Sequence, residues 1–224
     1  MGNTNGSLEI KEVYELPQGV FMVNQIIEPD NQDTTFSKFG SGKNERLKLT
    51  LYNSNNAPRT IFFPKGLIFQ NSIPGFHNGM LLQTTWMTIE AGARRDVIVE
   101  LFCINSGLLH NNQDSHYNFL GITGSPTLSR LLDLIGWRKI NYEMIYGTFK
   151  GGPHATPSGP TYADITARLQ TIVWNLTDIG IDISQEDTKF IESIPKLFPD
   201  EIPPVDKTSS SYPEYFHEFE VPRN

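Results

Sequence analysis

The sequence is poor in the features that most often identify a function. Cys103 is the single cysteine among 224 residues, so an internal disulfide framework is excluded and the redox compartment is left open. The net charge is −7, from 25 acidic and 18 basic residues without a basic cluster, which argues against a nucleic-acid partner. No apolar run approaches the roughly 20 residues that cross a bilayer, so we expect no membrane span.

Sequence signatures of common cofactor sites are missing as well. The five histidines are scattered, without the i, i+4 pairing or the Cys/His spacing of a zinc site. His110 and His116 flank Asp114, but polar residues of one loop are usually solvated. The segment "GSGKN" at 40–44 lacks the spacing and the following helix of a phosphate-binding loop. We expect no metal and no cofactor, and a protein that is not an enzyme.

The N-terminal stretch "MGNTNGSLEI" has neither a basic segment nor an apolar segment, so no signal peptide is visible. An Asn- and Gly-rich start is typical of the tether of an exported protein. We therefore expect an extracellular or cell-surface location, with a cytoplasmic one as the alternative.

The first half of the chain alternates as half-buried strands do, with turn signals between the runs. The expected strands are 7–16, 19–28, 45–53, 59–70, 79–90 and 94–104. Pro64 falls inside one of them and marks a sheet edge or a bulge. This spacing predicts an immunoglobulin-like β-sandwich over residues 8–110.

After about residue 110 the apolar period becomes helical. The expected helices are 125–137, 161–178 and 184–198; the first opens with Ser125 as N-cap and Pro126 at the first helical position. Together they predict a helical subdomain over 111–198, packed on the sandwich in an α+β fold. The Pro/Ser-rich segment 199–224 is expected to be an extended tail.

Two segments carry chemistry when they are considered together. "FCIN" at 102–105 ends an expected strand, and "LQTIVWNLTD" at 169–178 lies in an expected helix. The pair resembles the signature of the thioester domains of bacterial surface adhesins. In that family an aromatic residue or Leu precedes Cys on a strand, and a later helix carries Thr-Gln, three residues, then Trp. The sequence departs from it at Leu169, where the family has Thr, and at Asn175, where an apolar residue is expected.

The resemblance implies an internal thioester between Cys103 and Gln170, shielded from water by Phe102 and Trp174. A thioester is an activated acyl group that survives only where solvent is excluded until a nucleophile arrives. The resemblance thus implies an adhesion domain that acylates an amine on a protein partner or on a neighbouring subunit.

Two other hypotheses remain open. The first is a non-covalent structural or assembly module of a surface layer, filament or multi-subunit complex, with oligomerisation but no thioester. The second is a cysteine hydrolase in which His110 or His116 activates Cys103. The alternative to any reactive role is that Cys103 only packs in the core, because a free cysteine is often a small buried apolar residue.

Overall fold

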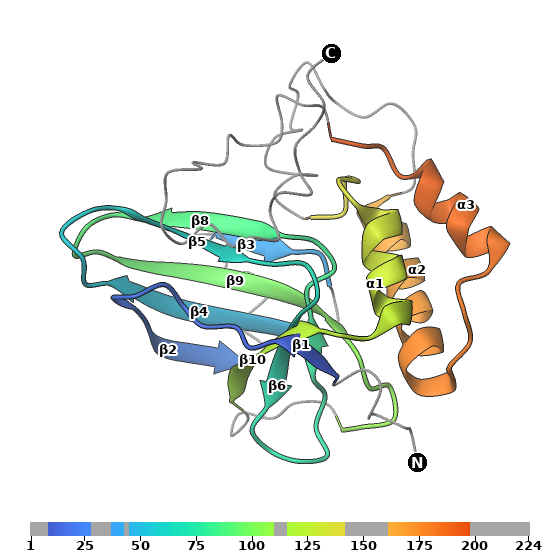
Figure 1. The fold of residues 1–224 in the computed structure, drawn as a ribbon, viewed down its shortest axis with the longest axis horizontal. Coiled ribbons are helices and arrows are strands. Elements are labelled where there is room, and N and C mark those ends of the chain that lie inside the picture. Colours follow the sequence, from blue (N-terminus) through green and yellow to red (C-terminus); the bar gives the residue numbers. More distant parts are fainter. Residues whose placement is uncertain (1–8, 28–36, 43–44, 110–115, 142–160, 198–224) are drawn as a thin grey trace.

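The computed structural model describes residues 9–27, 37–42, 45–109, 116–141 and 161–197 (Figure 1). The strands are β1 (Ile10–Glu12), β2 (Val20–Ile27), β3 (Ser37–Gly40), β4 (Glu45–Asn53), β5 (Arg59–Phe63), β6 (Leu67–Asn71), β7 (Gly79–Met80), β8 (Thr85–Ile89), β9 (Arg94–Cys103) and β10 (Tyr117–Thr123). The helices are α1 (Pro126–Ile135), α2 (Tyr162–Trp174), the π-helical turn η2 (Asn175–Ile179) and α3 (Gln185–Ser193). The fold is therefore a β-rich α+β fold.

One curled sheet forms most of the molecule. Its strand order is β1-β10-β6-β7-β9-β4-β2, and β3 also pairs with β9. These neighbours are antiparallel except β3 and β9, which run parallel. β5 and β8 form a separate antiparallel pair. The central strand β9 is buried from Val97 to Cys103, so it carries an almost continuous apolar run rather than an alternating one.

Two of the expected long strands are each divided in the structure. The run 59–70 splits into β5 and β6 around Pro64, because Pro cannot donate a ladder hydrogen bond and Gly66 then turns the chain at φ +79°. The run 79–90 splits into β7 and β8. Pro64 therefore follows the end of a strand and does not form a bulge within one.

The helix starts agree with the predicted caps, whereas α1 ends at Ile135 and α3 at Ser193, earlier than the expected ends at 137 and 198. The Ser125 side chain accepts from the backbone N–H of Leu128, with Pro126 in the first turn of α1. Ser184 caps α3 in the same way, by accepting from the N–H of Asp187. The helical part begins later than expected, because residues 117–123 form β10, which pairs with β6 and β1. The predicted tail 199–224 lies outside the described residues.

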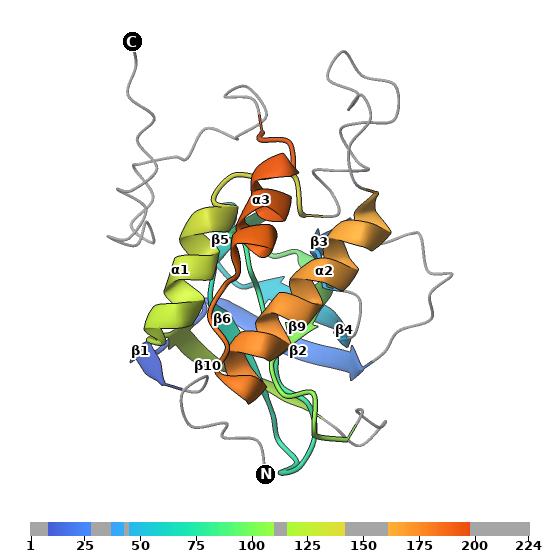
Figure 2. The same cartoon turned by 90° about the vertical axis from the view of Figure 1, so that its right-hand side faces the viewer.

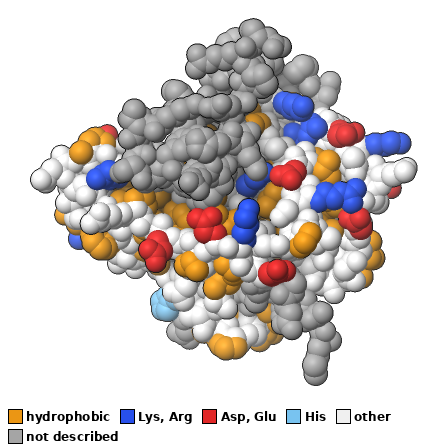
Figure 3. Space-filling model, viewed as in Figure 1, with side chains coloured by type: hydrophobic (Ala, Val, Ile, Leu, Met, Phe, Trp, Pro, Cys, Tyr) orange, Lys and Arg blue, Asp and Glu red, His pale blue; other side chains and the backbone are white. Residues whose placement is uncertain are grey.

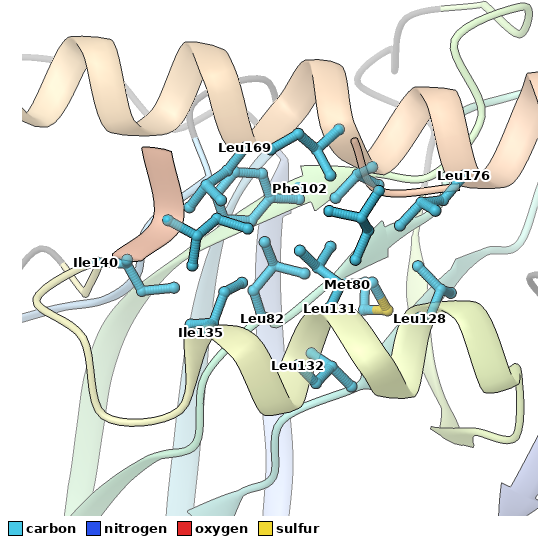
Figure 4. Packing of buried hydrophobic residues seen from close by; sticks show 14 of the residues in the cluster. Met80, Leu82, Phe102, Leu128, Leu131, Leu132, Ile135, Ile140, Leu169 and Leu176 are labelled. Atoms are coloured by element: carbon cyan, nitrogen blue, oxygen red, sulfur yellow. The ribbon is translucent and has the colours of Figure 1, made fainter. Parts of the chain in front are cut away.

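The three helices cover one end of the curled sheet, as Figure 2 shows. Between them and the sheet lies a helix-facing core, in which Phe102 and Leu169 lie close together between α1 and α2 (Figure 4). Its buried members are Ile68, Met80, Leu82, Phe102, Ile104, Leu128, Leu131, Leu132, Ile135, Ile140, Ile165, Leu169, Ile172, Val173, Leu176, Ile183, Ile191 and Ile194. A second core, the sheet core, fills the curl itself and includes Leu47, Phe69, Val99, Leu101 and Tyr117.

Charged side chains of both signs are interspersed on the face shown in Figure 3. None of the described helices has the length and apolar character needed to span a membrane.

The helix-facing core predicts a large effect for Leu131, which is 0% exposed. We expect Leu131→Ala to lower the free energy of unfolding by about 2–5 kcal/mol, because truncation leaves a cavity between α1 and the sheet. Leu134→Ala on the same helix is the matched control, since Leu134 is only partly buried. Denaturant unfolding measures both variants, and equal losses would contradict this account of the core.

Candidate functional site

Cys103 is the last residue of β9 and is fully buried. It stands opposite Gly79 of β7, and the next backbone N–H, that of Ile104, donates to the carbonyl of Asn78. The N–H of Asn105 points to the Cys103 sulfur, with an N to Sγ distance of 3.5 Å. The sulfur is therefore held inside the fold, where the sheet meets the loop 105–108.

Gln170 lies on α2 and meets Cys103 directly, although 67 residues separate them. The backbone N–H of Cys103 donates to Gln170 Oε1 at 3.0 Å, and Gln170 Nε2 donates to the carbonyl of Cys103 at 2.7 Å. Both residues are buried, and Gln170 is 5% exposed. The structure thus brings together the two residues that the sequence motif pairs.

These two hydrogen bonds also perform a structural task. A buried backbone N–H or C=O without a partner costs free energy, and β9 ends at Cys103, inside the molecule. The carboxamide of Gln170 supplies one acceptor and one donor, which match the two backbone groups. The same contact therefore attaches α2 to the end of the sheet.

The two predicted shielding residues occupy different surroundings. Side chains alternate along a strand, so Phe102 points to the helix-facing core while Cys103 points to the opposite face, together with Leu101. Trp174 lies four residues after Gln170 on the same side of α2 and is partly buried. Its indole Nε1 and the Asn105 Nδ2 are buried and have no hydrogen-bond partner within the described part of the chain.

The face of β9 to which Cys103 points holds a buried ionic cluster that the sequence did not reveal. His77 Nδ1 lies 2.7 Å from Glu45 Oε1, and His77 Nε2 lies 2.9 Å from the carbonyl oxygen of Leu108. The Tyr117 hydroxyl donates to Glu45 Oε2 at 2.9 Å. One ligand-type atom from each of Glu45, His77 and Cys103 lies within 4.8 Å of the other two.

The cluster favours a charged histidine. Burial disfavours the imidazolium and by itself would lower the pKa of His77, but hydrogen bonds and charge interactions with Cys103 and Glu45 outweigh it and raise that pKa to about 10. Both ring nitrogens face acceptors, a carboxylate and a carbonyl, which suits a ring that donates twice. The group near the sulfur is then an imidazolium at neutral pH.

Among the described residues, His77 is the histidine that lies beside the sulfur. His110 lies outside the described residues, and the backbone N–H of His116 is bound to Ser72 Oγ. No sequence pattern linked His77 to Cys103. Glu45 in β4, His77 in the turn before β7 and Cys103 at the end of β9 come together only in the folded chain. Glu45, His77 and Cys103 also offer the oxygen, nitrogen and sulfur donors that zinc accepts.

A second ionic group fixes the first turn of α2. The Tyr162 hydroxyl donates to Glu100 Oε2 at 2.8 Å and to the Ser41 carbonyl at 3.0 Å. Burial raises the pKa of Glu100, while its hydrogen bond with Tyr162 and the charge of Arg46 act in the opposite direction. Glu100 belongs to β9, and Gln170 lies two turns after Tyr162 on α2. The hydrogen bond between Tyr162 and Glu100 therefore helps to fix the position of α2 along β9 at which Gln170 meets Cys103.

A cleft of about 720 Å³ opens next to this region. Its lining includes Asn71, Phe76, Asn78, Asn105, Leu108 and Asp178. The Ser106 N–H donates to Asp178 Oδ2 at 2.8 Å, so η2 closes one wall against the loop after Cys103. The cleft lining thus includes Asn105 and Leu108, which contact Cys103 and His77 respectively.

The Gln170 contact predicts a strong effect for Gln170→Glu. A carboxylate cannot donate to the Cys103 carbonyl and would face its oxygen, so we expect a loss of at least about 2 kcal/mol in the free energy of unfolding. Thr171→Ala is the control, because Thr171 is exposed and bonds only within the helix in the described structure. Denaturant unfolding of both variants tests this, and a Gln170→Glu variant as stable as the control would refute the assigned contact.

The raised pKa of His77 predicts a pH-dependent stability in protein whose Cys103 thiol is free. Between the ordinary value of 6.5 and about 10, the folded state holds a proton that the unfolded state has lost. The stabilisation is complete below pH 6.5 and disappears as the pH rises to about 10, with a slope of up to about 1.4 kcal/mol per pH unit. His77→Gln should remove this slope in unfolding measured across that range; equal slopes would contradict the assignment.

Comparison of the chain with protein-family models, curated proteins and solved structures finds no match. The functional assignment therefore depends on the residues of the site and their contacts.

Proposed function

We propose that this protein is a cell-surface binding domain that forms an internal thioester between Cys103 and Gln170 and transfers the Gln170 acyl group to an amine of a protein partner. The observation that carries the proposal is the double hydrogen bond between the Gln170 carboxamide and the backbone of Cys103. It holds the Gln170 carboxamide against the backbone of the residue that carries the buried thiol, and this supports the pairing that the motif resemblance implies.

The chemistry of bond formation follows from these contacts. The Cys103 sulfur, turned about its χ1 angle toward α2, attacks the Gln170 Cδ. The C–Nε2 bond breaks, and the nitrogen takes up the proton of the thiol and leaves as ammonia. The Cys103 N–H, already 3.0 Å from Oε1, stabilises the negative charge that develops on that oxygen. Asn105 Nδ2 and Trp174 Nε1 are buried donors without a hydrogen-bond partner in the described part of the chain, and they belong to residues close in sequence to Cys103 and Gln170.

Transfer to a partner is the reverse type of attack. An amine attacks the Cδ, the Cδ–Sγ bond breaks, and an amide crosslink and a free Cys103 thiol remain. Burial of both residues keeps water from the thioester before that moment. The cleft beside Asn105 provides the approach for the amine. Because the transfer consumes the thioester, the reaction is a single acylation rather than steady-state turnover.

The resemblance to thioester domains extends the proposal to the fold and the location. It implies an immunoglobulin-like arrangement of the strands in the curled sheet, and exposure of the domain at a cell surface.

A non-covalent module of a surface layer, filament or complex is the second candidate, and the same contact favours it. Gln170 satisfies both buried backbone groups of Cys103 without any covalent bond. In that case Gln170 fixes α2 to the sheet and the thiol stays free.

Intact mass under native, non-reducing conditions separates the two. We expect the wild-type chain to lack the mass of one ammonia, and methylamine treatment to leave a methylamide on Gln170. Cys103→Ala and Gln170→Ala should each carry the full mass of their sequence. Gln83 is an internal control, because it is also buried and bonds backbone carbonyls of Gly136 and Arg138; it should stay unmodified. A wild-type mass equal to the plain sequence, with no adduct, overturns the thioester.

A further inference from the structure

Three side chains of the metal-binding types meet near the end of β9. Glu45 comes from β4, His77 from the turn before β7 and Cys103 from β9, and one ligand atom of each lies within 4.8 Å of the other two. The side chains of His77 and Glu45 are 4% and 1% exposed, and Cys103 is 0% exposed. Because a buried ion pair often stabilises a fold no better than apolar residues of similar volume, stability alone does not account for this cluster.

The imidazole and the carboxylate are each held by a contact of the kind that supports metal ligands. His77 Nε2 lies 2.9 Å from the carbonyl oxygen of Leu108, and a metal-binding histidine usually donates its second ring N–H to such an acceptor. This contact leaves His77 Nδ1 facing Glu45 Oε1. The Tyr117 hydroxyl donates to the other oxygen of Glu45, Oε2, at 2.9 Å. One nitrogen and one oxygen are therefore left to face the interior of the cluster.

The spacing of the three ligand atoms fits a small ion. Bond lengths of about 2.3 Å to sulfur and about 2.0–2.1 Å to nitrogen or oxygen place the ligand atoms of a tetrahedral zinc site about 3.3–3.6 Å apart. His77 Nδ1 and Glu45 Oε1 are 2.7 Å apart, so an ion between them moves them apart by about 0.6 Å. The Cys103 sulfur completes the group, and the backbone N–H of Asn105 points to it at 3.5 Å.

The donor set selects among metals. Calcium and magnesium take oxygen ligands, whereas zinc accepts sulfur, nitrogen and oxygen together. A thiolate, a carboxylate and a neutral imidazole balance the charge of Zn²⁺, so the loaded cluster carries no net charge into the interior. The ion displaces the proton between His77 Nδ1 and Glu45 and the proton of the Cys103 thiol, and both are released to solvent.

We propose that Glu45, His77 and Cys103 bind one zinc ion through Oε1, Nδ1 and Sγ, with water in the fourth position. Within the described part of the chain the cluster offers three ligand residues, and zinc sites with three protein ligands complete their coordination with water. The cleft supplies the access for the ion and the water, because Asn105 and Leu108, which contact the sulfur and His77 Nε2, belong to its lining.

The zinc site does not depend on the proposed function, since it requires only a free thiol. A sulfur that is acylated by Gln170 has no charge to give to a metal. Zinc therefore binds the chain that has not formed the thioester, or the chain that has lost it to an amine. The two proposals assign mutually exclusive states to one sulfur, and they are tested separately.

Cobalt reports the sulfur ligand directly in the full wild-type chain. Treatment with methylamine first ensures that Cys103 is a free thiol, and a chelator then removes any metal in the presence of a non-thiol reductant. With one equivalent of Co²⁺ we expect a near-ultraviolet thiolate-to-cobalt band and the visible bands of four-coordinate cobalt, and one equivalent of Zn²⁺ should remove both. X-ray absorption of the zinc-loaded chain should show one sulfur at about 2.3 Å.

Substitutions identify the other two ligands. Glu45→Gln and His77→Gln should each weaken zinc binding at least about 100-fold, measured by competition with a chromophoric chelator. Tyr117→Phe removes only the hydroxyl that supports Glu45 and should weaken zinc binding about 10- to 100-fold. Glu100→Gln is the matched control, because Glu100 is also a buried glutamate that accepts from a tyrosine hydroxyl, that of Tyr162, but lies outside the cluster. It should bind zinc as the wild type does, and circular dichroism establishes that each variant is folded.

The outcomes separate the zinc site from the thioester. A wild-type chain that binds no zinc at micromolar concentration overturns the zinc site, and so does one that binds it without a sulfur ligand, as an adventitious ion only. Folded Glu45→Gln and His77→Gln variants with wild-type zinc affinity overturn it as well. None of these results bears on the thioester, which the mass of the untreated chain decides; a full mass overturns the thioester and leaves the zinc site in place.

Discussion

The contact between the Gln170 carboxamide and the backbone of Cys103 is the interaction on which the site depends. β9 ends inside the molecule, and its last N–H and C=O need partners there; a side chain of α2 supplies both. This requirement fixes the rotation and depth of α2 over the sheet, with the Tyr162–Glu100 bond as a second attachment on the same strand. The helix-facing core then fills the space between α1, α2 and the sheet.

The opposite face of β9 has a different character. Alternation along the strand places Phe102 in the helix-facing core and turns Cys103 toward Glu45 and His77. Cys103 therefore has the Gln170 carboxamide at its backbone and the buried pair of His77 and Glu45 near its sulfur. Each of these neighbours has its own structural support, from α2 for Gln170 and from Tyr117 and Leu108 for the ionic pair. The proposed thioester lies at Cys103, where the helix-facing core, the sheet core and the cleft meet.

Local signals predicted much of the fold. Ser125 with Pro126, and Ser184 with Asp187, marked the helix starts because a cap acts within one turn. The alternation "ERLKLTLYN" predicted β4, whereas β10 was missed because its pairing with β6 and β1 is long-range. The pairing of Cys103 with Gln170 could be predicted from a motif resemblance alone. His77 could not, since its partners lie on strands whose proximity no local pattern records.

The sequence by itself determined the single thiol, the apolar run of β9, the helix carrying Gln170 and Trp174, and the caps that start the helices. These depend on short-range preferences and on residue chemistry. Only the tertiary structure decided that Gln170 meets the backbone of Cys103, that Phe102 points away from the sulfur, and that Glu45 and His77 face it. The reason is physical: burial of a charge, and satisfaction of a buried backbone group, depend on what the folded chain places around them.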